Sequence, residues 1–249
     1  MRFYNENVVY KKGFNIVEDQ EVIEVATYKG VSSKLFIYLL FLLLGVGLSF
    51  YLINTNPGLL VVMLGVSLIG TFITAFISLL SVRMVKTAGI IYCILEGILL
   101  GTISLFAELY IPGVAFAAIL ATLSVLMIVG TLYTTGIVKV NGTFVRFLSI
   151  FALSSLLLWA LLFLISWVAP SVINIFNFDN LLVMILISTV FIFLATLYLF
   201  WDLQKIREIV EGGYPKQMEW FGAFGLIFTT IWLYVQILRL LLIILARRD

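Results

Sequence analysis

Apolar residues fall into seven long runs that occupy most of the chain, and nearly all charged residues lie between these runs. A helix needs about twenty residues, each adding 1.5 Å, to cross the roughly 30 Å hydrocarbon core of a bilayer. The pattern therefore predicts an all-α integral membrane protein with seven transmembrane helices. We expect these helices at residues 34–53, 58–82, 88–110, 114–135, 144–168, 180–201 and 220–246.

The composition agrees with this class. Hydrophobic residues make up 63% of the 249 residues and charged residues only 11%, whereas a soluble domain carries about 25% charged residues. The first 33 residues are mostly polar and lack the short apolar core and small-residue cleavage site of a signal peptide. We expect a cytoplasmic N-terminal arm at residues 1–33 and one transmembrane domain at residues 34–249.

Lysine and arginine are distributed unevenly among the connections between the apolar runs. Lysine and arginine occur in the N-terminal arm and in the connections at residues 83–87, 136–143 and 202–219. The connections at residues 54–57, 111–113 and 169–179 carry none. Cytoplasmic connections accumulate positive charge, so the N-terminus is expected in the cytoplasm and, after seven crossings, the C-terminus outside. Arg247 and Arg248 oppose this orientation. The alternative is a last helix broken near Gly222 or Gly225, but its length favours a complete span.

The residue types that the chain lacks exclude several kinds of site. It has no histidine and one cysteine, Cys93, which rules out an intramolecular disulfide and argues against zinc, haem or copper sites. A hydrolase with a histidine base is excluded, and no glycine-rich phosphate loop follows a strand. The net charge of +2 does not indicate nucleic acid as a partner. We expect no enzymatic activity and no resident cofactor.

Glu96 lies about two turns inside the third predicted helix. An ionised, unpaired carboxylate at membrane depth costs roughly 2.5 to 3.5 kcal/mol. The glutamic acid is therefore a protonated group bonded to a neighbouring helix, a carboxylate paired with a cation, or an acid facing a water-filled path. Gly97 and Gly101 form a small-xxx-small pair that would let another helix approach closely.

Arg239 is the second costly residue at membrane depth. Seven apolar residues separate it from Arg247, so its guanidinium would be strained in reaching the interface. Gln236 lies three residues earlier and shares its helix face. Glu108, toward the outer end of the third helix, matches the depth of Arg239. Both an ion pair between Glu108 and Arg239 and a gating role for the arginine are open.

Asp202 and Glu219 lie at the cytoplasmic ends of the sixth and seventh helices. Such positions usually belong to solvated helix ends. The helix macrodipole would disfavour the anion of Asp202 at a C-terminus and favour that of Glu219 at an N-terminus. Glu219 is also a candidate ion-pair partner.

Several stretches together resemble the Bax-inhibitor (TMBIM, YccA-like) superfamily, in its bacterial seven-helix branch. They are residues 96–101, 202–206 and 233–241, with residues 26–31 ahead of the first helix and residues 215–226 before and within the last. The resemblance runs over all seven predicted helices. It implies a bundle of six helices around a central seventh, in the plasma membrane of a bacterium.

The resemblance also implies activities. Members of the superfamily are associated with a pH-sensitive calcium leak, with protection against stress and cell death, and with modulation of a membrane protease. In calcium-leak members an aspartate at the end of the sixth helix pairs with one in the seventh. Asp202 matches the first aspartate and is the implied calcium residue, whereas Gln236 replaces the second. Glutamine neither titrates nor adds negative charge, so Glu96 or Glu219 would have to compensate.

Two functions of different classes follow. The first is a cation leak channel in the lipid bilayer, with calcium as the implied ion. Glu96 would be its intramembrane acid, Asp202 the acceptor at the inner gate, and Gln236 with Arg239 the polar face of the central helix. The second is a non-conducting regulator that binds a membrane protease or a stress factor through the N-terminal arm and the loop at residues 202–219.

Overall fold

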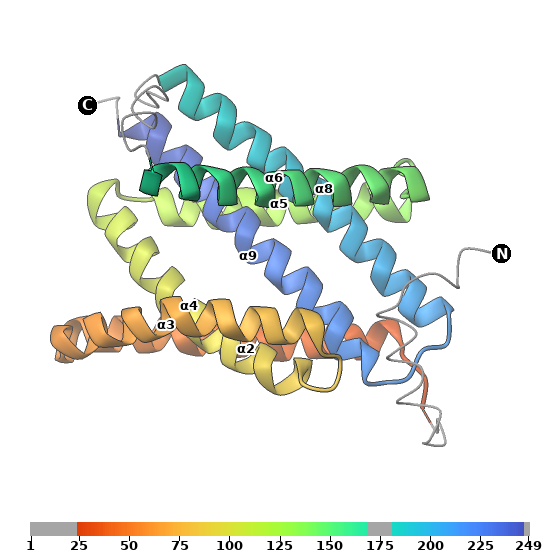
Figure 1. The fold of residues 1–249 in the computed structure, drawn as a ribbon. Helices are drawn as coiled ribbons and strands as arrows, with labels where there is room; N and C mark the ends of the chain where they lie inside the picture. The colour runs from red at the N-terminus through yellow and green to blue at the C-terminus, as the bar shows by residue number, and fades with distance from the viewer. Residues whose placement is uncertain (1–23, 169–180, 247–249) are drawn as a thin grey trace. The chain divides into compact units, whose positions relative to one another are not determined.

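The structure, a computed structural model, describes residues 24–168 and 181–246. Within these ranges it consists of helices and a single isolated β-bridge. This confirms the all-α prediction. The helices (Figure 1) are α2 (Tyr28–Thr55), α3 (Pro57–Leu80), α4 (Val85–Tyr110), α5 (Val114–Thr134), α6 (Gly142–Val168), α8 (Leu181–Glu211) and α9 (Met218–Leu245).

Six of the described helices are long and apolar enough to cross a membrane, namely α2, α3, α4, α5, α8 and α9. Helix α6 extends from Gly142 to Val168, and the part whose side chains are all described, Gly142–Ser155, is apolar. The multi-pass membrane class is therefore confirmed, whereas the count of seven spans and the orientation stay predictions. Most of the expected arm (residues 1–23), the expected start of the sixth span at residue 180, and residues 247–249 lie outside the described residues.

The chain divides into two compact units, which are described separately below. Unit 1 comprises Met1–Ile103 and Lys205–Ile227, and unit 2 comprises Ser104–Gln204 and Phe228–Asp249. Helices α4, α8 and α9 thus each contribute to both units. The expected arrangement of six helices around a central seventh stays a prediction.

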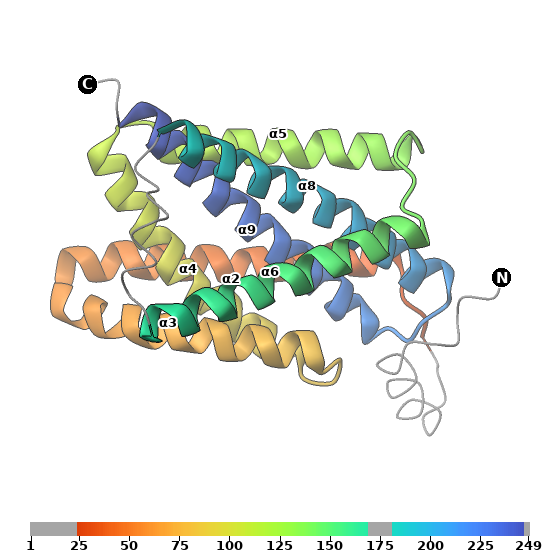
Figure 2. The same ribbon diagram turned by 45° about the horizontal axis from the view of Figure 1, so that its top comes forward.

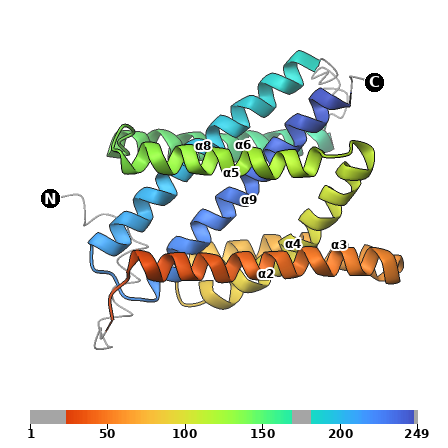
Figure 3. The same ribbon diagram turned by 180° about the vertical axis from the view of Figure 1, so that it is seen from behind.

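In unit 1, α2 and α3 lie side by side and run in opposite directions (Figures 1 and 3). Asn56 alone connects them. Its backbone N–H donates to the Leu52 carbonyl at the end of α2, and its side-chain Oδ1 accepts from the Leu59 N–H at the start of α3. Pro57 occupies the first turn of α3, where its missing N–H costs nothing. A single residue thereby ends one helix and caps the next.

Helices α2 and α4 cross at glycines. A Cβ atom on Gly97 would lie 2.2 Å from the Leu42 carbonyl oxygen, and one on Gly45 would lie 2.2 Å from the Ile94 carbonyl oxygen. One turn further along, a Cβ on Gly101 would meet the Ser49 hydroxyl at 2.2 Å. The close helix approach expected from Gly97 and Gly101 is therefore confirmed, with α2 as the partner helix.

In unit 2, Leu181–Gln204 of α8 lies beside Phe228–Leu245 of α9, and the two helices run in opposite directions (Figure 2). The rings of Phe191 and Tyr198 both pack edge-on against Trp232, with centroids 6.5 and 5.9 Å away. The Tyr198 hydroxyl also donates to the Leu148 carbonyl of α6.

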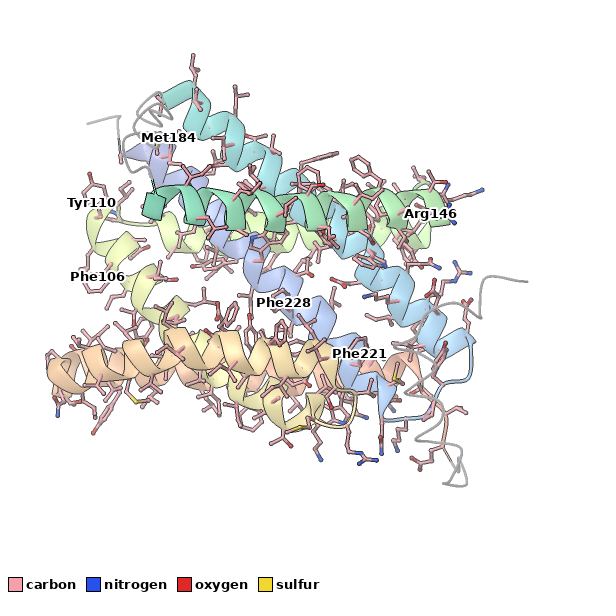
Figure 4. All side chains as sticks on the ribbon, in the orientation of Figure 1. Phe106, Tyr110, Arg146, Met184, Phe221 and Phe228 are labelled. Atoms are coloured by element: carbon pink, nitrogen blue, oxygen red, sulfur yellow. The ribbon has the colours of Figure 1, made fainter. Side chains whose placement is uncertain are left out.

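At the end of α4, Phe106 and Tyr110 project outward and are largely exposed (Figure 4), as expected of side chains that meet lipid.

Two helix ends differ from the prediction. Helix α2 begins at Tyr28 instead of residue 34, because the Thr27 side chain caps it by accepting from the Gly30 N–H at 3.0 Å. Helix α8 continues to Glu211, beyond its apolar run. Its last part is amphipathic, with Ile206 and Ile209 buried, so it folds as helix without being apolar all round. Helix α9 is continuous from Met218 to Leu245. The alternative of a last helix broken near Gly222 or Gly225 is therefore not observed.

Candidate functional site

A short segment ahead of α2 is fastened to the connection between α8 and α9, within unit 1. Val25 and Pro215 form the isolated antiparallel bridge. The Ala26 N–H donates to the Tyr214 carbonyl at 2.7 Å, and the Lys216 N–H donates to the Glu24 carbonyl at 3.2 Å. We call this arrangement, residues 24–27 with residues 214–216 and Glu219, the clasp. It joins the two segments that the sequence assigned to the arm and to the loop of the regulator hypothesis.

Glu219 is the centre of the clasp. Its side chain is 1% exposed, although it lies in the first turn of α9. The carboxylate accepts from the Thr27 N–H at 2.9 Å, from the Thr27 hydroxyl at 3.2 Å and from Lys34 Nζ at 2.5 Å. The solvated helix end expected at Glu219 is therefore wrong, because three donors from α2 and its cap replace water.

The Glu219 carboxylate occupies the space beside Gly30 where any other residue would have a side chain. A Cβ atom on Gly30 would lie 1.9 Å from Glu219 Oε1, closer than any van der Waals contact. The position therefore requires glycine for its missing side chain. Thr27 and Gly30 belong to a stretch that formed part of the family resemblance. The sequence did not indicate that this stretch contacts the Glu219 side chain.

Aromatic rings complete the surroundings of the clasp. Lys34 and Lys86 both place Nζ over the ring of Trp220, at 6.0 and 5.5 Å from its centroid. Tyr38, fully buried, packs edge-on against Trp220 and Phe224. These contacts hold the start of α9 against α2 and α4 through cation–π and edge-to-face geometry.

An exposed ion pair lies at the rim of the clasp. Lys216 donates to the Glu24 carboxylate. The hydrogen bond and the charge of Glu24 raise the pKa of Lys216. A raised lysine pKa gives a contribution to stability that is complete below the unfolded value, about 10.4, and that is lost as the pH rises through the folded value. The charge of Lys216 is therefore constant between pH 5 and 8.

Glu96 lies in the middle of α4, in unit 1, and is half-buried. Among the described residues it forms no hydrogen bond and no ion pair. Its nearest titratable neighbours, Tyr92 and Cys93, lie on the same helix face and are themselves buried. The bond to a neighbouring helix that would make Glu96 purely structural is not observed in this part of the chain.

A cavity of about 330 Å³ lies in unit 2 between α6, α8 and the second half of α9. We call it the α9 cavity. It contains the two polar residues that the sequence assigned to the seventh helix, Gln236 and Arg239. Its lining consists of Phe151, Ala152, Ser155, Phe191, Leu194, Tyr198, Trp232, Gln236 and Arg239. Gln236 Oε1 is buried and accepts no hydrogen bond from the described residues.

Asp202 is buried, with 8% of its surface exposed, and lies on α8 one turn after Tyr198 of the cavity wall. Because α8 continues to Glu211, Asp202 is inside a helix, and the expected effect of a helix C-terminus on its charge does not apply. Its pairing with Gln236 stays a prediction. Within residues 24–168 and 181–246, no group of three or more acidic, cysteine or histidine side chains could hold a metal ion.

Glu108 and Arg239 have surroundings different from those expected. The Glu108 carboxylate accepts from the backbone N–H groups of Gly113 and Ala115, at 2.6 and 3.1 Å, and so caps the start of α5. Gly113 adopts a φ of 87°, which favours glycine. In the described part of the chain, neither Glu108 nor Arg239 forms an ion pair. Arg239 is exposed, and it is one of the residues that line the α9 cavity.

The comparisons with known proteins agree with the sequence motifs. A family model described as Bax inhibitor 1 like matches residues 5–246, nearly the whole chain. No curated protein matches the chain. The family match covers both units, and it includes the clasp and the α9 cavity.

Proposed function

Because the chain belongs to the Bax inhibitor 1 like family, we propose that it forms a pH-sensitive leak pathway for cations, with calcium as the transported ion. The observation that carries the proposal is the α9 cavity. Gln236 and Arg239 reach it from the mostly apolar second half of α9, and Asp202 is buried one turn from its wall. Polar and ionisable side chains at membrane depth are costly, and they commonly mark ion or substrate pathways.

The sparse set of acidic groups suits a leak better than a binding site. Calcium that is held tightly takes six to eight oxygen ligands, several of them carboxylates. Conduction instead requires binding that is weak enough for the ion to leave. In the proposal, Asp202 supplies one carboxylate at the inner gate, and the Gln236 amide supplies an oxygen without a second charge.

Arg239 and the two intramembrane acids would control the leak. The guanidinium in the cavity lining opposes the entry of a cation, so it acts as an electrostatic barrier. Protonation of Asp202 or Glu96 would remove the negative charge that attracts the ion, and this gives the pathway its dependence on pH. The role of Glu96 rests on its lack of a hydrogen-bonding partner among the described residues.

The test is calcium flux into proteoliposomes measured between pH 5 and 8. Wild-type protein should conduct, Asp202→Asn should flatten the pH profile, and Gln236→Asp should steepen it by restoring two carboxylates that repel one another. The matched control is Glu211→Gln, an exposed acid on the same helix as Asp202. Flux equal to that of protein-free vesicles, in both wild type and Gln236→Asp, would overturn the proposal.

One observation favours the alternative of a non-conducting regulator. The clasp joins the segment ahead of α2 to the connection between α8 and α9, and together they form a polar cytoplasmic surface in the predicted topology. Such a surface could hold a membrane protease. The discriminating experiment measures the cleavage of a model membrane substrate by a purified membrane protease, with and without this protein. Inhibition without any calcium flux would make this the function.

A further inference from the structure

We propose that the α9 cavity binds a single-chain anionic amphiphile, a long-chain fatty acid, with its carboxylate on Arg239 and Gln236 and its hydrocarbon chain along the aromatic wall. The inference does not depend on ion conduction. It rests on the charge, the position and the shape of the cavity lining within unit 2.

The charge in the cavity lining lacks a protein counter-ion among the described residues. Arg239 is exposed and forms no ion pair there, because Glu108, the acid expected to neutralise it, caps α5 instead. A guanidinium presents several N–H donors in a planar fork that matches a carboxylate. An anionic head group would therefore supply the missing partner.

Gln236 adds a second polar contact on the same helix face, three residues before Arg239. Its Oε1 is buried and accepts no hydrogen bond from the described residues. The amide N–H groups, and not Oε1, are the donors that would contact a carboxylate in the cavity, so one ligand head could bond both side chains.

The positions along α9 give the ligand a direction. Arg239 lies six residues before the end of the helix at Leu245, about 9 Å along its axis. Trp232 lies two turns deeper and forms the wall together with Phe191 and Leu194. With its head at Arg239, nearer the helix end, and its tail directed to the middle of the helix, the ligand would have the orientation that a fatty acid adopts in a bilayer.

The volume agrees with a single acyl chain. About 330 Å³ lies at the lower end of the range for ligand pockets, roughly 300 to 1,000 Å³. One acyl chain fits this space better than the two chains of a phospholipid. Aromatic and leucine side chains form most of the lining, and they suit contact with a hydrocarbon chain.

The experiment uses the full-length protein in nanodiscs of zwitterionic lipid without an ion gradient. A brominated long-chain fatty acid should quench tryptophan fluorescence saturably, and Trp232→Phe should remove the saturable part. Unlabelled fatty acid should compete, whereas the fatty alcohol of the same length should compete at least tenfold less. Arg239→Gln should weaken the binding about tenfold or more, and Arg239→Lys should weaken it less.

Arg146→Gln is the matched control, because Arg146 is an exposed arginine that projects from the start of α6 outside the cavity lining (Figure 4). It should bind like the wild type. Ala152→Phe, which fills the cavity, should abolish the saturable quenching while gel filtration shows a folded, monodisperse protein. Non-saturable quenching, or equal competition by acid and alcohol, would overturn the proposal. Equal competition by a two-chain anionic phospholipid would also overturn it, since the occupant would then be a membrane lipid.

Discussion

Glu219 and Lys34 form an ion pair between residues that are 185 positions apart in the sequence, with Oε2 and Nζ separated by 2.5 Å. The glutamate side chain is 1% exposed and the lysine side chain 15% exposed. This pair fixes the first turn of α9 to α2. The backbone bridge between Val25 and Pro215 and the cap at Thr27 reinforce the same connection.

The first prediction concerns this ion pair. Glu219→Gln should lower the free energy of unfolding by about 3 kcal/mol, because removing one member of a buried pair leaves the other charge poorly solvated. Thermal unfolding in detergent measures the change as a lower Tm. Glu211→Gln should cost about 1 kcal/mol or less, because its pair with Arg207 is exposed. Equal losses from the two variants would contradict the structural role of Glu219.

The second prediction concerns the space beside the Glu219 carboxylate. Gly30→Ala should destabilise the protein by about 1 to 3 kcal/mol, since the new methyl group displaces the carboxylate from Thr27 and Lys34. Gly47→Ala is the control on the same helix, because no atom lies within 4 Å of a Cβ there. That variant should be neutral or slightly stabilising, as alanine favours the helix over glycine. Limited proteolysis ahead of α2 should accelerate only in Gly30→Ala.

The third prediction concerns the crossing of α2 and α4. Gly97→Ala should destabilise by about 1 to 3 kcal/mol, because its methyl group would meet the Leu42 carbonyl, a backbone atom that cannot rotate away. Gly65→Ala on α3 provides the comparison, since its Cβ would point into open space. Chemical unfolding in mixed micelles measures both variants. A neutral Gly97→Ala would show that the helices are further apart than the structure places them.

The fourth prediction concerns Glu96. If this acid controls a leak, Glu96→Gln should change the calcium flux and its pH profile while the protein still inserts, because glutamine keeps the shape and removes the titrating group. The measurement is flux into proteoliposomes between pH 5 and 8. Lys216→Gln provides a control, since the raised pKa of Lys216 keeps its charge constant over that range. An unaltered profile in Glu96→Gln would remove Glu96 from the mechanism.

The fifth prediction concerns orientation. Topology reporters fused at Gly136 and at Asp249 should be cytoplasmic and external respectively, because only alternate connections carry lysine and arginine. Enzymatic reporters that are active on one side of the membrane make the measurement. A cytoplasmic signal at Asp249 would contradict this orientation, because it would mean that the number of crossings is even.

The hydropathy pattern by itself determined the membrane class and the helix positions. The apolar runs coincide with the described helices to within a few residues at most ends, because a bilayer demands a fixed length of apolar helix whatever its neighbours are. The exceptions are informative. Helix α2 starts early because a side chain caps it, and α8 ends late because its last turns bury Ile206 and Ile209. Neither effect depends on hydropathy alone.

The sequence also identified the chemistry-bearing residues, but it could not assign their partners. It singled out Glu219 and Glu108, yet only the tertiary structure places Glu219 against Thr27 and Lys34, and Glu108 on the N–H groups that begin α5. A charge at the end of a helix has the same sequence signature whether water or another helix surrounds it. Burial and hydrogen bonding depend on segments distant in sequence, and therefore on the packing of the folded chain.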